Sequence, residues 1–140
     1  TGQRCFVLMS GERQIERLLK NMDPEINQGE YVFCSVKNLK KINFKDIIAF
    51  LKEKEGFTLV IEKNKAICLG LQFTFISSWI TLNVHSSLDA VGFNSIISNS
   101  LSENNISCNV IAGFHHDHLF VSINNAEKAL SILKNLSQNS

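Results

Sequence analysis

Two long stretches in the second half of the chain most constrain its fold, WITLNVHSSLDAVGF (79–93) and CNVIAGFHHDHLFVSINNAEKALSILKNL (108–136). In the first, Ile80, Leu82 and Val84 alternate with polar residues, as in a strand with one buried face. The second contains two more alternating strands around a turn, followed by a helix. This order supplies most of a βαββαβ unit, in which two helices cover one face of a small sheet. Such units bind and regulate more often than they catalyse.

The helices of this half have recognisable starts. Ser86 followed by Asp89 approximates a capping box and predicts a helix that extends through Leu101. Asn124 and Glu127 repeat the pattern before the last helix. The inward strand positions that we expect after residue 107 are Cys108, Val110, Ala112, Leu119, Val121 and Ile123.

The first half is less regular. Ile15, Leu18, Leu19 and Met22 recur at helical spacing and predict a helix with one buried stripe. Strands are expected at 31–36, 57–61 and 72–76, and a single helical turn at 66–71. A second helix is expected to begin at Asn43 and end at Gly56, with an inner face made of three apolar residues, Ile47, Phe50 and Leu51.

Composition excludes several classes of protein. The 140 residues suffice for one compact domain or two small modules that share a core. A formal charge of +1 argues against an electrostatic nucleic-acid binder. No apolar run approaches the roughly 20 residues that span a bilayer, so no membrane association is expected. The four cysteines form no CxxC pair, which argues against a zinc finger and favours a reduced, cytoplasmic protein.

The motifs VHSSLDAVGF, ISCNVIAGFHHDHLFV and EYVFCSV closely resemble a small bacterial family of ACT-domain proteins, from about Met9 onward. The family is described as predicted regulators of amino-acid metabolism with two ACT-like modules. The resemblance implies an α+β, ferredoxin-like fold, with an N-terminal module at 9–76 and a C-terminal one at 77–140. Residues 1–8 are then either a tag-like extension or a native edge strand. It also implies a homodimer that binds a small molecule, usually an amino acid, at a module or dimer interface.

The first candidate ligand site is the strand-to-helix loop at His85, Ser86, Ser87, Leu88 and Asp89. Unpaired N–H groups at a helix start suit a carboxylate, and the two serine hydroxyls add donors. Asp89 could then meet the ammonium group of an amino acid. The structural alternative is that Ser86 only caps its own helix, while Asp89 interacts favourably with the helix dipole.

The second candidate is the strand that contains Asn109, Ala112 and Gly113. If Asn109 projects away from the buried side of its strand, it could reach a ligand across an interface. Gly113 would let a backbone approach closely. The alternative is a hydrogen-bonded strand asparagine followed by a turn glycine.

The run HHDH at 115–118 invites a metal interpretation, since histidine is a common metal ligand. Consecutive hairpin residues point in different directions, however, so one chain could present only His116 and His118 together. A closed zinc site needs four ligands, so the default is a polar hairpin tip with Asp117 shaping the turn.

No catalytic motif stands out. The chain has no nucleophile elbow and no glycine-rich phosphate loop, and Cys34 lies in so apolar a strand that inert packing is the better interpretation. We therefore expect a protein that is not an enzyme and has no cofactor. The leading hypothesis is an amino-acid-sensing regulator. The alternatives are a structural or partner-binding module without a small ligand, or a metal-binding protein that uses the histidine run.

Overall fold

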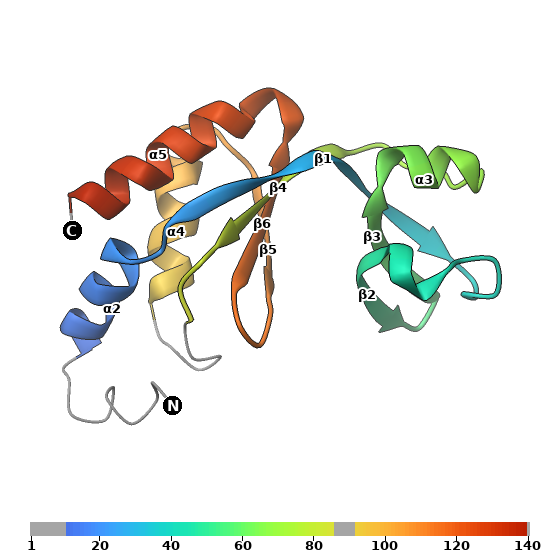
Figure 1. The fold of residues 1–140 in the computed structure, drawn as a ribbon, viewed down its shortest axis with the longest axis horizontal. Helices are drawn as coiled ribbons and strands as arrows, with labels where there is room; N and C mark the ends of the chain where they lie inside the picture. Colours follow the sequence, from blue (N-terminus) through green and yellow to red (C-terminus); the bar gives the residue numbers. More distant parts are fainter. Residues whose placement is uncertain (1–10, 86–91, 140) are drawn as a thin grey trace.

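The computed structural model describes residues 11–85 and 92–139, in which six strands form one antiparallel sheet in the order β2-β3-β1-β4-β6-β5. In Figure 1, α2, α4 and α5 lie in one lobe with β4, β5 and β6, while α3 lies in the other lobe with β2 and β3. Short 3-10 turns at Phe44–Asp46 and Ile123–Asn125 precede β2 and α5. The elements are α2 (Gly11–Lys20), β1 (Pro24–Val36), β2 (Ile47–Glu53), β3 (Gly56–Glu62), α3 (Lys63–Cys68), β4 (Ile76–Leu82), α4 (Phe93–Ser102), β5 (Cys108–Ala112), β6 (Asp117–Ser122) and α5 (Ala126–Gln138).

Strand β1 runs through both lobes (Figure 1). Its first residues pair with β4, and its second half pairs with β3. The register with β4 shifts between Asn27 and Tyr31, and Gly29 lies inside this bulge with φ +108°. A side chain rarely adopts that φ, so glycine allows the strand to change direction as it passes from one lobe to the other.

The larger core joins both halves of the sequence. Leu18, Leu19 and Met22, from α2 and the turn after it, are buried in the same cluster as Ile80 of β4 and Leu133 of α5. Helix α2 therefore packs in the lobe formed by the second half of the chain. The other lobe has its own smaller core, made of Val32, Cys34, Ile61 and Ala66.

The predicted fold class is confirmed, because β4, α4, β5, β6 and α5 follow in the expected order and form an α+β, ferredoxin-like arrangement. Cys108 and Val110 pack against the larger core as predicted, whereas Ala112 is exposed. The described part of α4 begins at Phe93, later than the predicted start, and its N-cap is Gly92. The N-cap of α5 is Asn125 and its side chain makes no capping bond, so the prediction of a cap at Asn124 was wrong.

Three predictions for the first half were also wrong. Residues 47–53 form strand β2, because they pair along β3, and the Asn43 side chain caps only a 3-10 turn by accepting the Lys45 N–H at 3.0 Å. No strand forms at 72–75, and β4 begins at Ile76. Strand β1 begins at Pro24 and not at Tyr31. Within the described ranges, no helix is long and apolar enough to cross a membrane.

Candidate functional site

The candidate site lies where the chain leaves β4. Asn83 ties this exit to the turn between α2 and β1: its backbone N–H donates to the Met22 carbonyl at 2.6 Å. Its side-chain amide donates to the Asp23 carbonyl and to a Glu25 carboxylate oxygen, both at 3.0 Å. The loop that follows is thus anchored at its beginning by a backbone segment from the other half of the chain.

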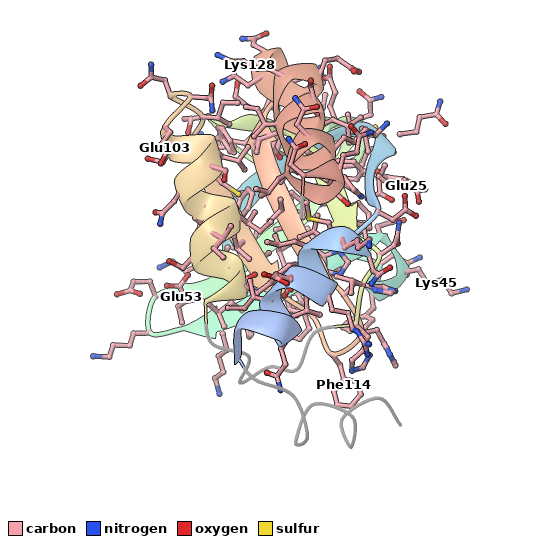
Figure 2. All side chains as sticks on the ribbon, turned by 90° about the vertical axis from the view of Figure 1, so that its left-hand side faces the viewer. Glu25, Lys45, Glu53, Glu103, Phe114 and Lys128 are labelled. Atoms are coloured by element: carbon pink, nitrogen blue, oxygen red, sulfur yellow. The ribbon has the colours of Figure 1, made fainter. Side chains whose placement is uncertain are left out.

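His85 lies against the hairpin between β5 and β6. Its ring centroid is 6.2 Å from that of Phe114 and 5.9 Å from that of His115, with both pairs edge-on. The hairpin tip is closed by the Gly113 N–H, which donates to the His116 carbonyl at 2.9 Å. Phe114 is exposed and projects at one end of the molecule, opposite the end that carries Lys128 in Figure 2.

The predicted site residues divide into three groups. Ser86, Ser87, Leu88 and Asp89 lie outside the described residues. The second group lies at the hairpin end of the sheet and contains His85, Ala112 and Gly113. Strand β6 lies between β4 and β5 there, and its Asp117 pairs with Leu82 of β4 on one side and with Ala112 of β5 on the other. Asn109 does not join them.

Asn109 lies further along β5, and strand alternation places it on the sheet face opposite Ala112. Its side-chain amide donates to the Phe120 carbonyl at 3.5 Å on the neighbouring strand. Asn109 is exposed, so a contact with a ligand on that face would have to come from a neighbouring module.

His118, the last residue of the histidine run, takes part in hydrogen bonding within the sheet. The Trp79 Nε1–H donates to His118 Nδ1 at 3.0 Å, and since indole nitrogen only donates, this His118 nitrogen carries a lone pair and no proton. Burial and the neighbouring His116 lower the pKa of His118, while Asp117 acts in the opposite direction. His116 Nδ1 is buried without a hydrogen-bond partner among the described residues. Across 11–85 and 92–139, no group of three or more potential ligands gathers to hold a metal ion.

A row of polar contacts crosses the sheet face that the helices leave uncovered. Asn27 Nδ2 donates to Thr81 Oγ1 at 2.8 Å, and Thr81 Oγ1 lies 3.4 Å from His118 Nδ1. Beside this row the Trp79 ring stacks on Phe120 and meets Tyr31 edge-on at 5.3 Å. This face is therefore covered by its own aromatic side chains. Sequence reasoning did not find this row, whose only signal was the alternation of β4.

A hollow with a volume of about 430 Å³ lies at the bulge of β1, away from His85. Glu30 and Lys63 form an ion pair there with 2.6 Å between Oε1 and Nζ, so a ligand that enters would compete with this pair. Burial and the charge of Glu62 raise the pKa of Tyr31 next to it. Sequence reasoning missed this hollow, although Gly29 inside a strand was a signal for a bulge. The hollow is lined by Gln28, Gly29, Glu30, Glu62, Lys63 and Asn64.

Comparison with known proteins gives a consistent result. Two ACT domain family models match the chain, one over residues 10–78 and the other over residues 74–135. The chain is 43% identical to a Vibrio cholerae protein of unknown function, described as a possible transport protein, over 91% of this chain and 99% of that one, with a TM-score of 0.80. No curated protein sequence matches the chain.

Two aspartate kinase structures share the fold at low identity. One is the aspartate kinase of Clostridium acetobutylicum, with 14% identity over 84% of this chain and 34% of that chain and a TM-score of 0.59. The other is the regulatory subunit of aspartate kinase from Thermus flavus, with 5% identity over 81% of this chain and 95% of that chain and a TM-score of 0.55.

Proposed function

The chain belongs to the family of ACT-domain proteins, and on that premise we propose that it is a non-enzymatic regulator that binds an amino acid or a similar small molecule. ACT domains are regulatory modules that typically sense amino acids. The proposed modules extend over 9–76 and 77–140, and the proposed working form is a homodimer. The free thiols of Cys34, Cys68 and Cys108 support a reducing compartment, which we take to be the cytoplasm.

The position of His85 is the observation that best supports this function. His85, the last described residue before the Ser86–Asp89 segment, contacts Phe114 and His115 of the β5–β6 hairpin, so two parts of the chain that are distant in sequence meet at this point. We place the ligand carboxylate at the backbone N–H groups and hydroxyls of Ser86 and Ser87, and the ligand ammonium at Asp89. Gly113 would leave room on the hairpin side, since it has no side chain.

Binding regulates only if the ligand prefers one arrangement of the modules over another. A ligand between the loop and the hairpin meets this condition when a neighbouring module supplies part of its contacts. Asn109, exposed on the face opposite Ala112, is a residue that can make such a contact with a ligand held by a second module. The proposed site therefore includes the loop after β4 and Asn109. Each of them would contact a different ligand molecule, the loop one held by its own module and Asn109 one held by a neighbouring module.

Thermal unfolding in the presence of each of the twenty amino acids at millimolar concentration tests the proposal. A ligand at about one hundred times its Kd stabilises the folded state by about 2.7 kcal/mol, which raises Tm by several degrees. Calorimetry then gives the affinity. If no amino acid raises Tm, the sensor proposal is wrong, and a module that binds only a protein partner is the better account.

Two variants locate the ligand. Ser86→Ala removes a hydroxyl donor to a charged carboxylate, so we expect the Kd to rise about tenfold or more. Ser131→Ala is the matched control, because Ser131 is exposed on α5, and Lys128 of the same helix lies at the end of the molecule opposite Phe114 (Figure 2). Equal affinities for the two variants would place the ligand elsewhere.

A further inference from the structure

Large apolar side chains are exposed at the outer edge of the sheet, in β2 and in the 3-10 turn before it. Phe44, in the turn, is 67% exposed, while Leu51 and Phe50 of β2 are 63% and 45% exposed. The Phe44 and Phe50 rings meet edge-on at 5.8 Å. An apolar patch that is both contiguous and exposed is a candidate interaction surface.

These side chains lie on both faces of the edge strand. Phe50 pairs with Leu59, which pairs with Cys34 of the smaller core, so Phe50 lies on the face where α3 packs. Leu51 is the next residue, and strand alternation places it on the other face. A flat surface, such as that of a membrane, covers one of these faces at a time. An extended segment added beside β2 has side chains on both faces and therefore covers Phe50 and Leu51 together.

The backbone of β2 is available for such a segment. β2 stands at the end of the strand order and pairs only with β3, so its N–H and C=O groups on the other side can pair with an added strand. Natural edge strands often prevent such pairing with charged residues, whereas residues 47–51 are all apolar.

The lobe that carries this edge is basic. Residues 31–71 contain eight lysines and four carboxylates, so they carry a net charge of +4, although the whole chain carries only +1. The rest of the chain therefore carries −3. This separation of charge favours an acidic partner for the lobe that contains β2.

At the edge itself the carboxylates are engaged within the lobe and the lysines are not. Asp46 Oδ1 lies 3.7 Å from Lys65 Nζ of α3, and Glu53 accepts a hydrogen bond from a threonine hydroxyl of β3. Lys45, in the 3-10 turn, and Lys52, near the end of β2, are exposed and form no ion pair with any residue that the structure describes. Positive charge is therefore available on both sides of the apolar run.

We propose that the edge of β2 binds an extended, acidic segment of a partner protein as an added strand. Apolar residues in the middle of the segment cover Phe50 and Leu51, and carboxylates at its ends meet Lys45 and Lys52. Backbone pairing supplies affinity, and the flanking charges select an acidic segment. A second copy of the chain fits this edge less well, because it brings a second lobe of charge +4 against the first.

This surface goes beyond the proposed function and is separate from the proposed ligand site. β2 and β5 are the opposite edges of the sheet, and the hairpin next to His85 belongs to β5 and β6. Loss of the β2 contact would therefore leave amino-acid binding by the loop after β4 testable on its own. Absence of amino-acid binding would equally leave the β2 contact standing.

Fluorescence anisotropy of a labelled peptide, titrated with the full chain, tests the proposal. The probe has two glutamates at each end of a Val-Thr-Val-Thr centre. One control peptide has lysines in place of the glutamates. A second control has prolines in place of the two threonines, which keeps the charge but removes backbone N–H groups that an added strand needs.

We expect saturable binding of the glutamate peptide and binding of both control peptides that is weaker by about tenfold or more. Equal binding of the proline peptide would reveal a charge attraction without strand addition and would overturn the proposal. So would a glutamate peptide that does not bind at millimolar concentration.

Two exposed side chains of β2 locate the bound peptide. Lys52→Glu replaces an attractive contact by a repulsive one and should raise the peptide Kd about fivefold. Lys134→Glu is the matched control, because it changes the net charge equally but is exposed on α5 in the other lobe, and it should bind as the wild type does. Leu51→Ser should also weaken binding, whereas Ile67→Ser, on the exposed side of α3, should not. If each variant binds as its control does, the peptide lies elsewhere and the proposal is wrong.

The other occupants of this edge are tested with the same variants. Vesicles of phosphatidylcholine and phosphatidylserine stand for a membrane, and oligothymidylate stands for a single-stranded nucleic acid. Binding of either one that Lys52→Glu weakens, without binding of the glutamate peptide, would overturn the proposal. Sedimentation velocity on the chain alone tests the second copy, and a dimer that Leu51→Ser disperses would overturn it as well.

Discussion

Shortening Met22 to alanine tests whether the start of the chain is part of the core of the second half. The Met22 side chain is fully buried in one cluster with Ile80, Leu82 and Leu133. Removing a buried side chain of this size costs about 2–5 kcal/mol, out of a total of about 5–15 kcal/mol for a domain. The Met22 carbonyl that accepts the Asn83 N–H belongs to the backbone, so the variant keeps this contact and changes packing alone.

Urea denaturation is followed by the fluorescence of Trp79, the single tryptophan, and by far-UV circular dichroism. For Met22→Ala we expect the midpoints of both transitions to move together to a lower urea concentration. The free energy of unfolding should fall by about 3 kcal/mol, with an unchanged m-value. Glu16→Ala is the control, because Glu16 is exposed on the same helix and its loss should change stability by less than about 0.5 kcal/mol. A Trp79 transition that stays at the wild-type midpoint would show that the two halves unfold separately and that the shared core is unimportant.

Three further predictions concern the uncovered sheet face and the turns. Because burial lowers the pKa of His118 below 6.5, the unfolded chain binds the proton more readily, so folding stability should fall as pH drops from 7 through the folded pKa. The Tm difference between wild type and His118→Gln should shrink over that range, and a constant difference would contradict this. Trp79→Phe removes the donor to His118 and should cost about 1 kcal/mol, measured by thermal unfolding. At Gly56 (φ +143°) an added Cβ would collide with the Val36 carbonyl oxygen, so Gly56→Ala should cost more than Gly70→Ala, where φ is +70° but the space is open.

Sequence reasoning worked best where each strand had one clearly apolar face. Leu119 and Val121 alternate with polar or aromatic neighbours, and the structure buries both in the larger core. The same is true of Ile80 and Leu82. Since alternation is a property of the sequence itself, β4, β6 and their connections follow from it, and so does the α+β fold class.

Sequence reasoning failed where pairing with a distant strand decides the structure. Ile47, Phe50 and Leu51 have the spacing of a helix face, yet they form the edge strand β2, whose pairing with β3 outweighs local propensity. The apolar residues of this segment are consecutive and do not alternate with polar ones, so the sequence pattern of a half-buried strand is absent. In the structure the neighbours Phe50 and Leu51 are both exposed. At β1 the errors came from Pro24 and Gly29, which argue against a strand, but Pro24 occupies the first position and Gly29 the bulge.

At the candidate site, the register between β4 and β6 explains contacts that the sequence pattern alone did not predict. Leu82 pairs with Asp117, so the chain that follows β4 must lie beside the chain that precedes β6, and His85 meets Phe114 for this reason. Trp79 pairs with Phe120, so its large ring reaches the diagonal neighbour His118, which had been a metal candidate. A strand histidine should therefore be assigned first to the side chains that register places beside it. Only the nitrogens that remain after those contacts are candidates for a ligand or a metal.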